Sequence, residues 1–232
     1  MNSLNLHLEE EMFFSYKPYP GRIMGTLSKL LSEGRSPFLV PNVMKRFSEI
    51  QKHSASVQKK WADLCPVTAD LIARHPYGSA RFVRGTPKVW KFILAQPVRD
   101  GVVELKGATY DRLGGLHLAE VAVRKYIGRG LPREEALEDG FLLHAAQGRK
   151  TLEGFLDYRC EQEKNDKNLV RVTFPRPREY PFLQFLGFSN SGRYLGCPRF
   201  DDPDACLVGF REKDQHYDFA SVWLESMEEM HK

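Results

Sequence analysis

The 232-residue chain contains no apolar run long enough to cross a membrane, and its polar N-terminus carries no secretory signal pattern. Its four cysteines are scattered and form no Cys-x-x-Cys pair. This spacing excludes a dense disulfide framework, and Cys197, Cys206 and His216 match no common zinc module. We therefore expect a cytoplasmic protein with reduced thiols, no membrane partner, no metal and no other cofactor.

The sequence also lacks the GxxxxGK[ST], GxGxxG, HExxH and GxSxG signatures. Their absence argues against nucleotide hydrolysis, dinucleotide chemistry and classical proteolysis. Metal-independent RNA cleavage is not excluded, because attack by a 2′-hydroxyl needs only a base and a cation. The seven histidines are dispersed, and for each of them a structural role is favoured over a catalytic one.

The net charge of +4 is unevenly distributed along the chain. Residues 200–232 carry nine acidic and three basic side chains. Subtracting these from the totals of 30 and 34 leaves residues 1–199 with 21 acidic and 31 basic side chains, a net +10. Such a division favours a polyanionic partner for residues 1–199. The acidic tail could contact a basic partner protein or keep the molecule soluble, and we favour the second interpretation.

The basic character is most marked between Leu71 and Arg99, which hold six cations and no carboxylate. Aromatic residues, among them Tyr77 and Trp90, are interleaved with these cations. Guanidinium and ammonium groups match phosphates, and aromatic faces accept unpaired bases, so the pattern indicates RNA or DNA binding. The alternative is a solvated basic face whose rings belong to the core, and the sequence leaves both readings open.

The opening of the chain predicts a strand followed by an amphipathic helix. Residues 3–8 alternate apolar and polar side chains, and apolar residues recur at helical spacing from Ile23 to Leu31 before Gly34 ends the helix. This order is typical of ferredoxin-like domains, so we expect an α+β fold with a ferredoxin-like (RRM/RAMP-type) N-terminal domain. A mixed helical and β-rich C-terminal region should follow it.

The predicted organisation has three parts: a ferredoxin-like domain over residues 1–110, a basic RNA-binding region of helices and strands over 111–200, and an acidic extension over 201–232. Within them we expect a strand at 101–105, helices at 116–127 and from 131 toward 160, and strands at 169–174 and 182–188. The candidate nucleic-acid-binding residues are Arg74, Arg81, Arg84, Lys88, Lys91, Arg124, Lys125, Arg129, Arg133, Arg149, Lys150, Arg176, Arg178 and Arg193.

Short segments of the chain resemble one known family. Three of them carry the resemblance: the opening strand with the helix from Ile23 to Leu30, the basic helix with Arg124, Lys125 and Arg129, and the Gly187-to-Phe200 ending. They are similar to segments of the CRISPR repeat-RNA endonucleases of the Cas-six class, as found in type I-F and type IV systems. The matches cover about a quarter of the chain.

The resemblance implies a CRISPR RNA (crRNA) repeat hairpin as substrate, metal-independent cleavage, and retention with other CRISPR effector subunits in a ribonucleoprotein complex. The family's catalytic histidine is missing from the first helix, where this chain reads Lys29-Leu30-Leu31-Ser32. Arg22 and Arg35, which flank that helix, are then the candidate catalytic cations.

Three alternatives remain at this stage. The first is a non-catalytic subunit that caps or holds the crRNA, and the second is a DNA-binding accessory protein. The third is a basic protein–protein interaction module, which would be favoured if the cations of residues 71–99 were dispersed over the folded surface. Cations already held by neighbouring carboxylates would likewise count against RNA binding.

Overall fold

The structure is a computed structural model that describes residues 16–51, 66–162, 170–189 and 193–211. The helices are α2 (Ile23–Ser32), α3 (Val40–Ile50), α5 (Pro87–Leu94), α6 (Gly107–Asp111), α7 (Glu120–Arg124), α8 (Arg133–Glu138), α9 (Gly140–Ala145) and α10 (Arg149–Gln162). The strands are β1 (Tyr16–Pro20), β2 (Ser36–Pro37), β3 (Pro66–Arg74), β4 (Ala80–Val83), β5 (Val98–Arg99), β6 (Val102–Glu104), β7 (Leu116–Leu118), β8 (Gly130–Leu131), β9 (Val170–Val172), β10 (Phe182–Ser189), β11 (Tyr194–Gly196) and β12 (Cys206–Phe210).

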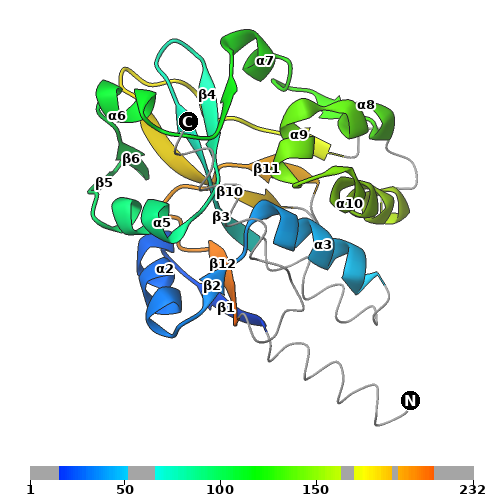
Figure 1. The fold of residues 1–232 in the computed structure, drawn as a ribbon, viewed down its shortest axis with the longest axis horizontal. Helices are drawn as coiled ribbons and strands as arrows, with labels where there is room; N and C mark the ends of the chain where they lie inside the picture. The colour runs from blue at the N-terminus through cyan, green and yellow to red at the C-terminus, as the bar shows by residue number, and fades with distance from the viewer. Residues whose placement is uncertain (1–15, 52–65, 163–169, 190–192, 212–232) are drawn as a thin grey trace.

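These strands form one mixed sheet of twelve strands, with the main order β1-β12-β3-β10-β11-β9-β8. Strand β3 lies antiparallel to β10 and β4 and parallel to β12. The first strand of the described chain, β1, pairs antiparallel with the last, β12, and Figure 1 shows them side by side in blue and orange. The two ends of the described chain therefore meet at one edge of the sheet.

This connectivity is not that of a ferredoxin-like domain, in which a βαββαβ segment closes its own sheet. Here β3 is hydrogen-bonded to β10 and β12, which come from the second and third predicted segments. The expectation of a ferredoxin-like N-terminal domain is therefore wrong. The sheet also crosses the predicted boundaries at residues 110 and 200, and residues 212–232 of the acidic extension lie outside the described ranges.

Helices cover the two faces of the sheet and enclose two clusters of buried apolar side chains. One cluster packs α3, α9 and α10 against the sheet, and the other packs α2 and α5 against the opposite face. Figure 1 shows α2, α5 and α6 on one side of the strands and α3, α8, α9 and α10 on the other. Because both faces are covered, the central strands β3, β10 and β12 are mostly apolar and are buried along nearly their whole length.

Several local predictions are confirmed. Helix α2 buries Ile23, Leu27 and Leu30 at helical spacing, and Gly34 follows with a φ of +67° that favours glycine. The buried strand predicted at 182–188 is β10. The helical region predicted beyond residue 131 is α8, α9 and α10 in succession.

The helix predicted over residues 116–127 is only partly present. Residues Leu116–Leu118 form strand β7 on the edge of β4, and α7 contains just five residues. The pattern of apolar residues in this segment is compatible with either a helix or a strand. Its first three residues form a strand because they pair with the edge of β4. The strand predicted at 3–8 lies outside the described residues. Within the described ranges, no helix is both long and apolar enough to span a bilayer.

Candidate functional site

Strands β9 and β11 form a part of the sheet in which only one face is fully buried. Strands β9 and β11 alternate between buried and partly exposed residues, whereas β3 and β12 are buried throughout. The inward residues Val170, Val172 and Leu195 belong to the cluster beneath α3 and α10. The side chains that alternate with them lie on the opposite, partly exposed face.

We call this surface the β9–β11 face and define it by Arg171, Thr173, Ser189, Arg193 and Tyr194. Strand β11 fixes its layout, since Tyr194 pairs with Arg171 on β9 and with Ser189 on β10. Thr173 lies over Gly196, where a Cβ would come within 2.6 Å of the threonine hydroxyl. Arg171, Ser189 and Tyr194 lie on paired strands, Thr173 directly follows β9 and Arg193 directly precedes β11. The paired strands give the surface a rigid support.

Two arginines converge on the ring of Tyr194. The guanidinium carbons of Arg171 and Arg193 each lie 5.8 Å from the centroid of that ring. The buried Nε of Arg171 has no hydrogen-bond partner in the described part of the chain. The face therefore combines two cations, one aromatic ring and the hydroxyls of Thr173 and Ser189, and these groups suit an anionic ligand.

Two of the cations predicted to bind nucleic acid are internal. Arg74 is 5% exposed, and its guanidinium donates to the backbone carbonyls of Gly78, Ser79 and Pro175. Burial lowers the pKa of Arg74 below its usual range. Arg84 is largely buried, with 16% of its side chain exposed, and it donates to the fully buried Asp70 carboxylate. Both side chains hold the fold together and are not presented to a ligand.

Five further cations of that set are paired with carboxylates at 2.5–2.9 Å: Arg124 with Glu120, Lys125 with Asp139, Arg129 with Glu135, Arg133 with Asp157, and Arg149 with Glu153. Three of the pairs lie within six residues along the chain. This local neutralisation leaves little net charge along α7, α8 and the start of α10. A role of these side chains in nucleic-acid binding stays a prediction.

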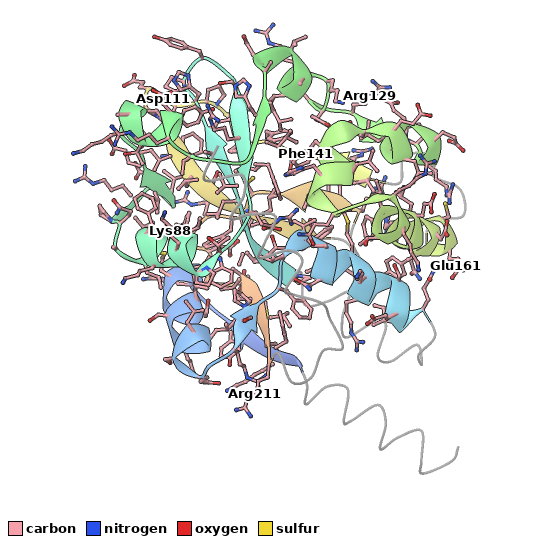
Figure 2. The ribbon with its side chains drawn as sticks, in the orientation of Figure 1. Lys88, Asp111, Arg129, Phe141, Glu161 and Arg211 are labelled. Carbon is pink, nitrogen blue, oxygen red and sulfur yellow. The ribbon has the colours of Figure 1, made fainter. Side chains whose placement is uncertain are left out.

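The remaining predicted cations are dispersed. Lys88, Lys91, Lys150 and Arg176 are exposed; the first two lie on α5 and Lys150 lies on α10, and Figure 2 labels Lys88 on α5. Arg178 donates to the backbone carbonyl of Asp100 and to the Tyr180 hydroxyl, and the Arg81 guanidinium lies 5.4 Å from the centre of the Tyr110 ring. Of the fourteen predicted cations, Arg193 is the one that lies on the β9–β11 face.

The candidate catalytic cations are not brought together. Arg22 lies at the N-terminal cap of α2 and Arg35 lies beyond its C-terminal end, so ten helical residues separate them. That length corresponds to about 15 Å of helix. Arg22 instead lies close enough to Asp201 to help lower the pKa of that carboxyl, after the larger effect of Arg199.

No group of three or more His, Cys, Asp or Glu side chains within the described ranges could hold a metal ion. Cys160 and Cys197 are free thiols, and His216 lies outside these ranges. Burial raises the pKa of Cys197 to about 12, so its thiol stays protonated and is a poor nucleophile or ligand at neutral pH.

Comparison with known proteins identifies the fold. No protein-family model and no curated protein sequence matches the chain. A solved structure from work on the accommodation of massive sequence variation in Nanoarchaeota by the C-type lectin fold superposes with a TM-score of 0.60. The superposition covers 84% of this chain and 97% of that one at 14% sequence identity. The chain therefore has a C-type lectin fold.

This finding corrects the family prediction. The resemblance to the CRISPR repeat-RNA endonucleases rested on short segments, and the fold that contains those segments is not theirs. The identification as a CRISPR endoribonuclease of a ferredoxin-like kind is therefore wrong. An opening strand and helix is shared by many folds, and it does not say which strands pair.

The sequence analysis found Arg193 but missed Arg171, Thr173 and Tyr194. The available signal was the alternation of Val170-Arg171-Val172-Thr173, in which a cation and a hydroxyl share one face of a predicted strand. The neighbouring Tyr194 could not be found in this way, because its pairing with Arg171 joins segments more than twenty residues apart.

Proposed function

We propose that this protein is a binding protein that recognises an anionic ligand through the β9–β11 face. The observation that carries the proposal is the convergence of Arg171 and Arg193 on the Tyr194 ring, on the partly exposed face of β9 and β11. Guanidinium groups form charge-assisted, often paired hydrogen bonds with carboxylate or phosphate. The tyrosine ring offers an apolar surface to the carbon skeleton that carries the charge.

The fold and the charge distribution support a binding role. The Nanoarchaeota structure is described as accommodating massive sequence variation, which suits a scaffold whose core is independent of its recognition surface. The cations of residues 71–99 are dispersed or internal, and this arrangement favours an interaction module over an extended RNA-binding trough. Free thiols at Cys160 and Cys197 are consistent with the cytoplasm as the expected compartment.

The anionic group could belong to an acidic glycan or an acidic peptide, and two probes separate these sources. A hyaluronan tetrasaccharide and a tetraglutamate peptide supply carboxylates, while chitotetraose and a tetraglutamine peptide are their uncharged counterparts. Isothermal titration calorimetry with the full chain should show binding of at least one carboxylate probe and no binding of its uncharged counterpart.

Arg171→Gln keeps much of the side-chain length but removes the charge, and it should weaken that binding about tenfold, or about 1.4 kcal/mol. Lys150→Gln is the control at an exposed position of α10, which packs on the other face of the sheet, and it should change affinity less than twofold. Equal loss in both variants, or no binding of either carboxylate probe, would overturn the proposal. Tighter binding of an RNA hairpin than of both probes would instead favour nucleic-acid recognition.

A further inference from the structure

Within the part of the chain that the structure describes, the large apolar side chains that are exposed lie at one end of the molecule. They are Tyr77 on the β3–β4 connection, Val121 on α7 and Ile127 just beyond α7, with exposures of 83%, 77% and 72%. Figure 1 shows the β3–β4 hairpin and α7 at the same end. A Cβ on Gly78 would lie 2.7 Å from the Glu120 side chain, so the turn and the helix are in contact.

Tyr77 stands on a turn whose backbone conformation is fixed by its own sequence. The Gly78 amide donates to the His75 carbonyl at 3.0 Å and closes a four-residue turn. Proline is favoured at the second position of such turns and glycine at the fourth, and Pro76 and Gly78 occupy these positions. The φ of +92° at Gly78 requires a residue without a Cβ.

Arg74 stabilises the same turn through hydrogen bonds. Its buried guanidinium donates to the carbonyls of Gly78 and Ser79, and it also reaches Pro175 on the segment that follows β9. The Tyr77 ring lies 5.0 Å from the His75 ring, which in turn lies 4.9 Å from the buried Tyr110 ring. A tyrosine presented on a fixed backbone loses little conformational entropy when it is bound.

The histidine beneath the ring has a defined tautomer. The Tyr77 amide donates to Nδ1 of His75 at 3.3 Å, so Nδ1 is the acceptor and the neutral imidazole carries its proton on Nε2. His75 therefore keeps a hydrogen-bond donor available beside the exposed ring. A donor next to an aromatic anchor is a feature of a recognition surface.

Basic side chains border this end of the molecule. Arg81 lies over the Tyr110 ring, His117 is its cross-strand neighbour on β7, and Arg112 is exposed at the end of α6 beside the exposed Asp111. Glu120 is already paired with Arg124. The exposed apolar residues are thus bordered mainly by hydrogen-bond donors and cations. A protein that binds this surface should therefore present carboxylates around its apolar contact.

We propose that the Tyr77 tip, formed by residues 75–79 together with α7 and Ile127, docks a protein partner that receives the tyrosine ring in an apolar pocket bordered by carboxylates. Tyrosine and arginine are the residue types that dominate binding energy at the centres of protein interfaces. This surface and the β9–β11 face are formed by different residues, so the protein would contact a partner and a ligand through different side chains.

Site-specific photo-crosslinking in the native cells tests this inference. The full chain carries p-benzoylphenylalanine in place of Tyr77, and a matched control carries it in place of Lys150, which is exposed at the start of α10. We expect a protein adduct at position 77 that is absent at position 150, with the crosslinked peptide containing apolar and acidic residues.

The purified partner then provides the quantitative test. Tyr77→Ala and Val121→Asp should each weaken its binding at least tenfold, whereas Lys150→Ala should change it less than twofold. Tyr77→Phe, which keeps the ring, should retain most of the affinity and controls for misfolding of the turn. The proposal is overturned if position 77 gives no adduct that is absent at position 150, or if the adduct contains a second copy of this chain or a lipid. It is also overturned if the crosslinked protein binds the Tyr77→Ala variant as tightly as the native chain.

Discussion

The carboxylate of Asp70 and the guanidinium of Arg84 lie 2.8 Å apart in the interior of the protein. Asp70 is fully buried, and it also accepts hydrogen bonds from the backbone amides of Val40 and Gly85. Arg84 donates in addition to the carbonyls of His144 and Ala145 at the end of α9. One ion pair thus joins β3, the start of α3, the β4–α5 connection and α9.

Asp70→Ala should destabilise the protein by about 3–5 kcal/mol, because it leaves a largely buried guanidinium without its counter-charge and two backbone amides without their acceptor. Urea denaturation at neutral pH measures this loss as a lower transition midpoint. Lys88→Ala, at an exposed position of α5, should shift the free energy of unfolding by less than about 0.5 kcal/mol. Equal stability of the two variants would show that the ion pair does not organise the core.

Gly85→Ala should destabilise the protein by about 1–3 kcal/mol through overpacking. A Cβ at this position would lie 2.7 Å from Nε1 of Trp90 and would also meet the backbone of Ala69. Gly107→Ala is the matched control, since a Cβ there meets no atom within 4 Å. Thermal unfolding of the two variants compares them directly, and a Gly85→Ala melting temperature at or above that of the native chain would contradict the packing.

Tyr126→Phe should cost about 1.5–3 kcal/mol of stability, the usual range for a hydrogen bond to a charged group. The Tyr126 hydroxyl donates to the buried carboxylate of Asp139 at 2.8 Å, and that carboxylate also caps α9 through the Leu142 amide. Burial and the nearby carboxylate raise the pKa of Tyr126, so the hydroxyl keeps its proton. Chemical denaturation tests the loss, and a neutral effect would mean that Lys125 and the Leu142 amide suffice as partners of Asp139.

Stability should fall as the pH rises from about 10 toward 12, with Tyr19 as one source. Burial, followed by the hydrogen bond to Glu33, raises the pKa of Tyr19 to about 12. The unfolded chain loses this proton near pH 10 while the folded chain retains it, so the unfolded state binds fewer protons and the free energy of unfolding decreases. Tyr19→Phe should flatten this slope in urea titrations at pH 9, 10 and 11, and Tyr77→Phe should leave it as steep as before.

Local patterns in this chain predict local structure well and long-range pairing poorly. The spacing of Ile23, Leu27 and Leu30 was enough to predict α2, because the helical periodicity of apolar residues can be recognised within a segment of ten residues. Nothing in the sequence near β1 indicates that its partner is β12, nearly 190 residues later. The fold class depended on that pairing and on the insertion of β10 beside β3, and it was therefore predicted wrongly.

The same limit applies to the charges. Cations were predicted to converge because residues 71–99 contain no carboxylate, yet the counter-charge of Arg84 is Asp70, one residue before that stretch begins. Lys125 likewise pairs with Asp139, fourteen residues away. Composition counts charges along the chain, whereas binding depends on which of them remain unpaired in three dimensions.

The most direct test of the account is an NMR titration of the full chain with the tetraglutamate peptide and, separately, with the hyaluronan tetrasaccharide. The account predicts that the amide signals of Arg171, Thr173 and Tyr194 shift with one of these probes and saturate together, while those of α5 and α10 stay in place. Shifts centred on Lys88 and Lys91, or no shifts at the β9–β11 face with either probe, would contradict it.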